Sequence, residues 1–192
     1  MARTKEFDQD LALDRAMRLF WSQGYEATSI QDLTDGMGIG RGSLYDTFED
    51  KHTLFLAALD RYRATVSARL FAPLEEPIPV RMALRRVFDH VVEEAQAEEH
   101  HGCLMANATL ELASRDATVR CRAAANLEGL EEKIGRVLAR AQREGEIGVH
   151  HDPRALARFL FNALQGLRVT AKVTPDRTVL EDIARVTLSV LG

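Results

Sequence analysis

The chain of 192 residues lacks the features of a membrane, secreted or disordered protein. No apolar run reaches the roughly 18 uncharged residues that a membrane-spanning helix needs, and the N-terminal stretch MARTKEFDQD lacks the apolar core of a signal peptide. Cys103 and Cys121, the two cysteines, are most simply reduced thiols. Hydrophobic residues make up 46% of the chain, enough for a packed core. We therefore expect a soluble cytoplasmic protein with no membrane partner.

Signatures of catalysis are missing as well. No Ser-His-Asp order, phosphate-binding loop or pair of carboxylates in an apolar setting emerges, so we predict neither a catalytic residue nor a cofactor. The stretch EEHHGCLMANATLE gathers potential metal ligands, because imidazole and thiolate bind transition metals. It contains no Cys-x-x-Cys and no spaced His pair, so we favour solvated surface histidines and predict no metal. The potential ligands are His100, His101, Cys103, Asn107 and Glu111.

Positive charge is scarce. The net charge is −4, and residues 1–52 carry six Lys or Arg against ten Asp or Glu. Net charge governs non-specific attraction to nucleic acid rather than the fold, so the local face matters more. From Gly38 to Tyr45 the only charged residue is Arg41, while Arg3 and Lys5 make the N-terminal arm basic.

Helical periodicity dominates the chain, strand signals are nearly absent, and we predict an all-α fold. The segment Ala72–Pro79, with three prolines, is the one clear linker signal. The predicted helices are Gln9–Gln23, a short one capped by Thr28 or Ser29 and running to Asp35, one from Gly40 or Arg41 to Phe48, one capped by Asp50 and reaching Leu70, Val80–Glu99, Leu104–Ala113, Thr118–Glu144, Pro153–Lys172 and Thr178–Leu191.

Two short helices joined by a glycine-containing turn, and preceded by a helix, form a helix-turn-helix. The first turns of its second helix enter the major groove of DNA. Gly40, Gly42 and Ser43 keep this turn free of bulk, and Arg41 can pair with guanine. The residues suited to contact phosphate are Tyr45 and Lys51.

The run GYEATSIQDLTDGMGIGRGSLYDTFEDKHTLFLAAL, Gly24–Leu59, resembles the helix-turn-helix of TetR-type (TetR/AcrR) transcriptional regulators almost throughout. It includes the ending Tyr-x-x-Phe-x-x-Lys-x-x-Leu. The segments GCLMANATLELA and QGLRVTAKVTPDR are similar, more loosely, to one branch of the family. The resemblance implies a homodimer with an N-terminal three-helix DNA-binding domain, residues 1–52, and a helical C-terminal domain, residues 53–192, for ligand binding and dimerisation.

The motif and the resemblance together give a set of DNA-contacting residues. Two positions depart from the family pattern. Gly40 stands where a capping Ser or Thr is common, and Asp46 stands where an aromatic residue or His is usual, so its charge beside Tyr45 would repel phosphate. The predicted contacts are Thr28, Ser29, Gly40, Arg41, Gly42, Ser43, Tyr45 and Lys51.

The resemblance further implies a ligand-responsive repressor that binds a palindromic operator and is released by a small hydrophobic inducer. The candidate pocket residues are Phe88, Val91, Cys103, Met105, Asn107, Asn126, Leu127, Phe159, Asn162 and Gln165. Helix Pro153–Lys172 is apolar almost all round and must be buried on every side. A second subunit is the expected cover, and a central place in a monomeric core is the alternative. The candidate dimer residues are Phe161, Leu164, Arg168, Ile183 and Thr187.

Two further interpretations stay open. Cys103 follows Gly102 at a predicted helix N-terminus, where the helix dipole favours the thiolate. Some regulators of the branch that it resembles carry a sensing cysteine there, so a repressor that senses electrophiles or oxidants is possible. We favour a small buried residue that only packs. The other alternative, which the acidic N-terminal segment supports, is an all-α small-molecule-binding or enzymatic domain that no longer binds DNA.

Overall fold

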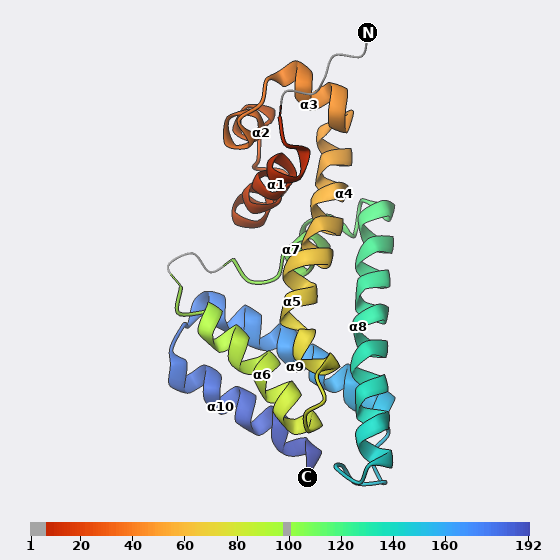
Figure 1. Cartoon of the computed structure of the whole chain (residues 1–192). Helices are drawn as coiled ribbons and strands as arrows, with labels where there is room; N and C mark the ends of the chain where they lie inside the picture. The colour runs from red at the N-terminus through yellow and green to blue at the C-terminus, as the bar shows by residue number, and fades with distance from the viewer. Residues whose placement is uncertain (1–6, 98–100) are drawn as a thin grey trace. The chain divides into compact units, whose positions relative to one another are not determined.

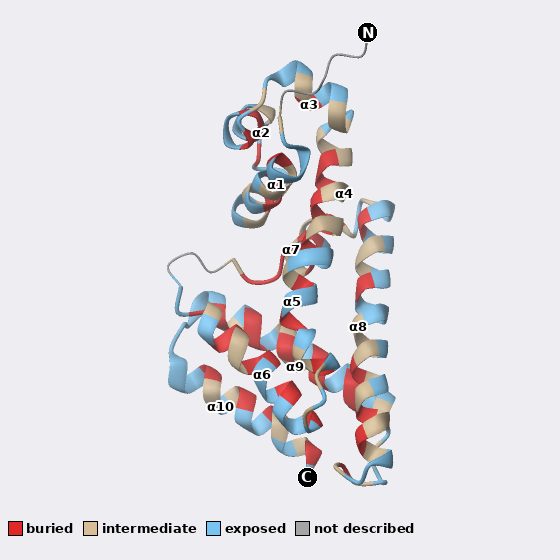
Figure 2. Cartoon of the chain, viewed as in Figure 1, coloured by how far each residue is buried: buried red, intermediate tan, exposed pale blue. Residues whose placement is uncertain are grey.

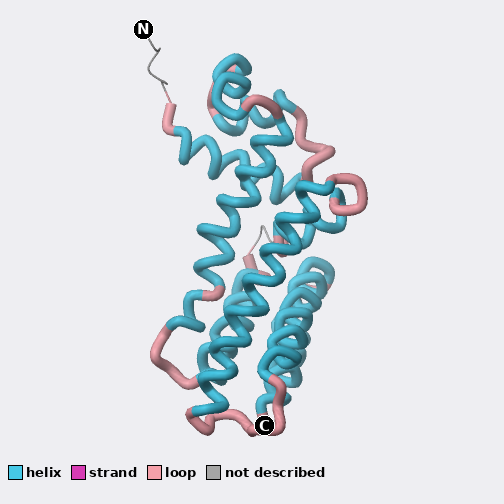
Figure 3. The backbone as a smooth tube through the Cα atoms, turned by 90° about the vertical axis from the view of Figure 1, so that its right-hand side faces the viewer, coloured by secondary structure: helices cyan, strands magenta, loops and turns pink. Residues whose placement is uncertain are grey.

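The computed structural model describes residues 7–97 and 101–192, and within these ranges every regular element is a helix (Figures 1 and 3). The all-α prediction is confirmed. Arg3, Lys5, His100 and the pair Glu98–Glu99 lie outside the described residues. Among the described helices, none combines the length and apolar character that a bilayer crossing demands.

Contacts divide the chain into two compact units. The first comprises Met1–Ser67 and Leu104–Cys121, and the second comprises Ala68–Cys103 and Arg122–Gly192. This differs from the single boundary expected after residue 52. The helix that follows residue 50 stays with the N-terminal unit because its apolar face, including Phe55 and Leu59, is fully buried there.

Local chemistry sets the starts of several α-helices in the first unit, which also includes the first residues of α8 (Ala117–Arg143). The α-helices that lie wholly within this unit are α1 (Gln9–Gln23), α2 (Ile30–Met37), α3 (Arg41–Phe48), α4 (Lys51–Tyr62) and α7 (Leu104–Leu112). Asp8, Ser29 and Asp50 accept hydrogen bonds from backbone N–H groups in the first turns of α1, α2 and α4. Helix α2 runs two residues past its predicted end and stops at Gly38, whose φ of 70° is left-handed.

Helices α1 and α4 are also joined by a forked ion pair. Arg61 on α4 donates from Nε to Asp14 Oδ1 at 2.7 Å and from Nη2 to Asp14 Oδ2 at 3.0 Å. These hydrogen bonds hold the pKa of the Asp14 carboxyl below its usual range. Helix α4 was predicted to continue to Leu70, but a π-helical turn, Arg63–Ser67, separates it from α5 (Ala68–Leu70).

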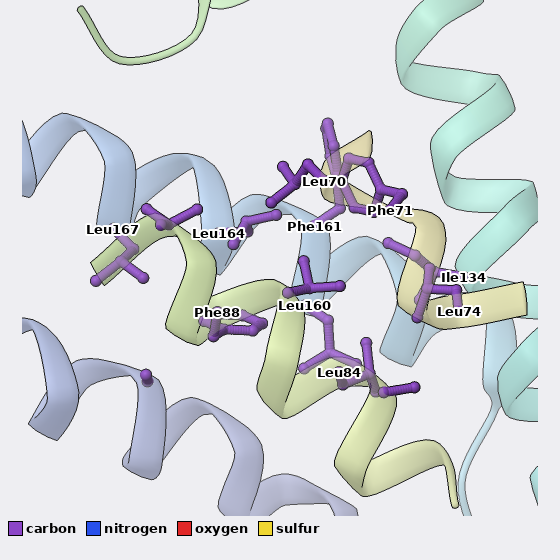
Figure 4. Packing of buried hydrophobic residues seen from close by; sticks show 14 of the residues in the cluster. Leu70, Phe71, Leu74, Leu84, Phe88, Ile134, Leu160, Phe161, Leu164 and Leu167 are labelled. Atoms are coloured by element: carbon purple, nitrogen blue, oxygen red, sulfur yellow. The ribbon is translucent and has the colours of Figure 1, made fainter. Parts of the chain in front are cut away.

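The second unit is built around α6 (Val80–Glu94), α9 (Pro153–Val173) and α10 (Arg177–Leu188), together with most of α8 (Ala117–Arg143). A 3₁₀ helix, Ala72–Glu75, occupies the predicted linker, and another, Ser189–Leu191, follows α10. Helix α6 ends at Glu94, five residues before its predicted end. The inner faces of α6 and α9 are buried (Figure 2), and their side chains interdigitate around Phe88 and Leu160 (Figure 4).

Most of the predicted dimer residues are buried within the protomer instead. Leu164 is 1% exposed, Arg168 4%, Phe161 6% and Thr187 7%. Leu164 lies among the packed residues between α9 and α6 (Figure 4), and Arg168 Nη2 lies 4.0 Å from Glu94 Oε2. These four side chains therefore fill the protomer and offer no surface to a second copy, whereas Ile183 is half-buried. The core of the protomer thus accounts for Leu160, Phe161, Leu164 and Leu167 of α9, whereas Phe159 is 48% exposed.

Candidate nucleic-acid interface

Helix α2 is bounded by a capping box and a C-terminal glycine, and α3 packs inward through one buried leucine. The Ser29 N–H donates to Asp32 Oδ2 at 2.8 Å, and the Asp32 N–H donates to Ser29 Oγ at 3.1 Å, which completes a capping box. After α2, the Gly38 N–H bonds back to the carbonyls of Thr34 and Asp35. Leu44, the buried residue of α3, has no exposed area. The opposite face of α3 is left on the surface.

Two glycines, Gly40 and Gly42, flank Arg41 at the start of α3, and packing within the protein does not require either of them. A Cβ at Gly40 or Gly42 would meet no atom within 4 Å, whereas a Cβ at Gly36 would lie 2.5 Å from Leu19 Cδ1. Gly36 thus packs against the Leu19 side chain, whereas Gly40 and Gly42 face open space. No side chain caps the N-terminus of α3, as expected for glycine at position 40. The backbone of this turn is open to a close approach from outside.

Three polar side chains of α3 line this open turn. The Arg41 guanidinium lies 5.8 Å from the centroid of the Tyr45 ring one turn later, within cation–π range. Tyr45 is 38% exposed, and Ser43 is partly buried beside them. Asp46 is exposed next to Tyr45, so the acidic departure noted in the sequence lies on the surface.

Lys51, the first residue of α4, rests on an aromatic ring that the sequence analysis missed. Its Nζ lies 4.4 Å from the centroid of Tyr25. The Tyr25 ring packs in turn on Phe55 at 4.8 Å and on Phe20 at 6.2 Å between centroids. Burial raises the pKa of the Tyr25 hydroxyl. Aromatic spacing alone could not have identified this pair.

Thr28 is the one predicted DNA contact that the structure buries. It has no exposed area, and its hydroxyl donates to the Gly24 carbonyl at 2.6 Å. Its side chain thus stabilises the turn before α2 and is not available to phosphate. Ser29, the next residue, is exposed.

The turn between α1 and α2 is also held by residues far along the chain. Glu111 on α7 accepts hydrogen bonds from the N–H groups of Tyr25 at 3.0 Å and Glu26 at 2.8 Å. Asp116, which precedes α8, lies 2.6 Å from His52 Nε2. Sequence reasoning had weighed Glu111 only as a metal ligand. No group of three or more described His, Cys, Asp or Glu side chains is arranged to hold a metal ion.

The predicted ligand-binding residues differ in their surroundings. Met105 and Asn107 belong to the first unit, and the other eight belong to the second. Phe88 and Val91 are in the core cluster, and Cys103, Met105 and Asn126 are buried. Leu127, Phe159 and Asn162 are exposed, and Asn107 and Gln165 are partly buried. Phe159 borders a hollow of about 310 Å³ with His150, His151 and Val190. A common pocket for these residues stays a prediction.

A second exposed surface runs along α9 and α10. Its five exposed large apolar residues are 40–81% exposed. Their spacing along each helix places them on one face. Gly166 lies on the same face of α9, with no atom within 4 Å of an added Cβ. We call this surface the apolar stripe. It consists of Phe159, Val169 and Val173 on α9, Val179 and Val186 on α10, and the partly buried Ile183 and Val190.

Comparison with known proteins gives a consistent result over the whole chain. Residues 12–58 match the family described as "Bacterial regulatory proteins, tetR family", and residues 81–187 match "Tetracyclin repressor-like, C-terminal domain". The chain is 38% identical to the uncharacterized HTH-type transcriptional regulator YezE of Bacillus subtilis (strain 168), over 100% of both chains. It is 35% identical to the HTH-type transcriptional repressor ComR of Escherichia coli (strain K12), over 97% of this chain and 90% of that one. Among solved structures it is similar to a cysteine mutant of the TetR family transcriptional regulator CifR complexed with 26-bp double-strand operator DNA, with a TM-score of 0.89, 29% identity and full coverage of both chains.

Proposed function

Because the chain belongs to the TetR family of bacterial transcriptional regulators, we propose that it binds a palindromic operator as a homodimer and represses transcription until a small hydrophobic inducer releases it. The observation that carries the DNA-binding part is the open first turn of α3. Its backbone is bare at Gly40 and Gly42 although internal packing does not demand it. The similar CifR structure holds operator DNA, and the similar ComR is named a repressor.

In this proposal the first turn of α3 enters the major groove. Arg41 is exposed there and its guanidinium can donate two hydrogen bonds to one guanine. Ser29, Ser43, Tyr45 and Lys51 contact phosphates, which fixes the position of the helix without reading sequence. We do not include Thr28 among the DNA contacts, because its side chain is buried.

The dimer of this proposal forms through the apolar stripe. Two copies that pack their α9 and α10 helices together give a four-helix bundle related by a two-fold axis. Five large side chains that are 40–81% exposed in the protomer would then leave water, and Gly166 allows close contact between the helices. A palindromic operator matches this symmetry.

DNA binding is tested by selecting sequences from a random pool and measuring the affinity of variants for the selected site. Arg41→Ala is expected to cost about 1–3 kcal/mol at one base pair and to relax the preference there. Lys51→Ala should weaken matched and mismatched sites alike. A band shift with the DNA upstream of the gene separates this function from a domain that no longer binds DNA, since that alternative predicts no retarded complex. Equal losses on matched and mismatched sites would refute base reading by Arg41.

A further inference from the structure

The turn that leads out of α1 has backbone donors that its own neighbourhood does not satisfy. Helix α1 ends at Gly24, whose φ of 85° turns the chain away from the helix. The next two N–H groups, of Tyr25 and Glu26, both donate to the carboxylate of Glu111, at 3.0 and 2.8 Å. A single carboxylate that accepts two N–H groups makes charge-assisted hydrogen bonds, which are stronger than neutral ones.

This close approach depends on the glycine. A Cβ at position 24 would lie 3.0 Å from Glu111 Oε2, tighter than ordinary van der Waals contact. Glu111 comes from α7, 86 residues further along the chain than Tyr25. The apolar packing of α7 is supplied by other residues, Leu104, Met105, Ala108 and Leu112, all of which are buried. Glu111 adds a directed polar contact to that packing.

The residue that Glu111 anchors is the one on which Lys51 rests. The Tyr25 ring carries the Lys51 ammonium group 4.4 Å from its centroid, and it meets the neighbouring His52 edge-on at 6.3 Å. A shift of the Tyr25 backbone would move this ring. The position of the Lys51 charge therefore depends on the turn that Glu111 holds.

The residues that follow α7 also contact the start of α4, the helix that carries Lys51. Asp116 Oδ2 lies 2.6 Å from His52 Nε2, while Asp116 Oδ1 accepts hydrogen bonds from the N–H groups of Thr118 and Val119 at the start of α8. Arg115 lies 2.8 Å from the Glu26 carboxylate. Residues 111–116 thus hold both the turn beneath Lys51 and the helix that carries it.

We propose that Glu111 is a positioning residue for DNA binding, which acts through Tyr25 to hold the Lys51 ammonium group where it meets a phosphate. This rests on the phosphate contact of Lys51 in the proposed function. Glu111 itself touches no DNA. Its loss should reduce affinity by removing one correctly placed positive charge, and this gives a readout that simple destabilisation of the fold does not.

The test uses the full-length protein and a DNA site selected by the wild type from a random pool. Affinity is measured by fluorescence anisotropy over a range of salt, at a temperature where circular dichroism shows each variant fully folded. In Glu111→Gln one N–H faces an amide NH₂ group and the charge is lost, and Glu128→Gln, an exposed residue of α8, is the matched control. Glu111→Gln and Lys51→Ala should each bind about tenfold more weakly. The plot of log K against log salt has a negative slope, and each variant should reduce the magnitude of that slope by about one.

The double variant decides the route. If Glu111 acts through Lys51, Glu111→Gln should cost less than about twofold in the Lys51→Ala background, because the charge that it positions is already gone. Additive losses, or a salt slope unchanged in Glu111→Gln, would overturn the proposal. Wild-type affinity in Glu111→Gln, with Lys51→Ala weakened, would overturn it and leave the proposed function intact. Wild-type affinity in Lys51→Ala would overturn the phosphate contact and the inference together. If Glu111→Gln does not fold, Tyr25→Leu removes the supporting ring and must show the same change of slope.

Discussion

Val169→Glu is expected to convert the proposed dimer into folded monomers. Val169 is 57% exposed in the protomer, so a carboxylate at this position stays in water and leaves the protomer intact. In the dimer it would be buried against the partner's stripe without a counter-charge. We estimate about 3 kcal/mol for each buried carboxylate. Two-fold symmetry introduces two of them, and about 6 kcal/mol weakens dimerisation by roughly ten-thousand-fold.

Sedimentation velocity at micromolar concentration measures this change, with circular dichroism as the check on folding. Val149→Glu is the control, because Val149 is 88% exposed and lies outside the apolar stripe, so it should leave the dimer unchanged. Leu164→Glu should behave differently and unfold the second unit, since Leu164 is 1% exposed in the core. A dimeric Val169→Glu variant, or a monomeric wild type at micromolar concentration, would refute the assignment of the interface to the stripe.

The remaining predictions concern the first turn of α3, the two thiols and the loss of folding stability at low pH. Gly42→Ala should leave the protein as stable as the wild type or up to about 1 kcal/mol more stable, because the methyl group meets no atom within 4 Å. The same variant should weaken operator binding in anisotropy measurements. The control is Gly129→Ala, equally open on α8, which should leave DNA binding unchanged. Iodoacetamide should label exposed Cys121 before buried Cys103 in peptide mass analysis. Cys103→Ser should keep its response to hydrophobic inducers and lose no response to electrophiles or oxidants; loss of a response to electrophiles or oxidants would mean that the thiol senses them. The depressed pKa of Asp14 stabilises the fold above the ordinary carboxyl value of about 4, and this contribution is lost as the pH falls below it, so urea midpoints should fall less steeply with acid in Asp14→Asn.

Local chemistry explains which elements could be predicted from the sequence. Helix α1 has the predicted bounds because an aspartate caps its start and a glycine with positive φ ends it. Ser29 and Asp50 cap α2 and α4 with their side chains, as predicted from the sequence. Each of these features depends on residues within one or two helical turns. The helix-turn-helix can therefore be recognised from the amino-acid sequence alone.

Features that depend on tertiary packing could not be obtained in this way. Periodicity indicates that α9 has apolar residues on several sides, but it does not tell which side meets its own core. Leu160, Leu164 and Leu167 pack within the protomer, while Val169 and Val173 remain exposed. The contact between Glu111 and Tyr25 joins residues 86 positions apart, and neither residue has a local pattern that announces it. The exposed face of α9 and the contact of Glu111 could not be predicted for the same reason, because the tertiary fold determines which residues a side chain contacts.

The acidic excess of residues 1–52, which had supported a domain unable to bind DNA, has a structural explanation. Asp8, Asp32 and Asp50 accept hydrogen bonds from backbone N–H groups at helix starts or caps, and Asp14 pairs with Arg61. Carboxylates at helix N-termini offset the partial positive charge of the exposed N–H groups, so their number says little about the face that α3 presents. That face carries Arg41 beside a bare backbone, with Asp46 one turn further along. A negative net charge lowers non-specific attraction to DNA, so in the proposed function binding depends more heavily on a few well-positioned cations, of which Lys51 is one. In the role proposed for Glu111, the hydrogen bonds from the turn before α2 to α7 hold this lysine in place from outside the helix-turn-helix.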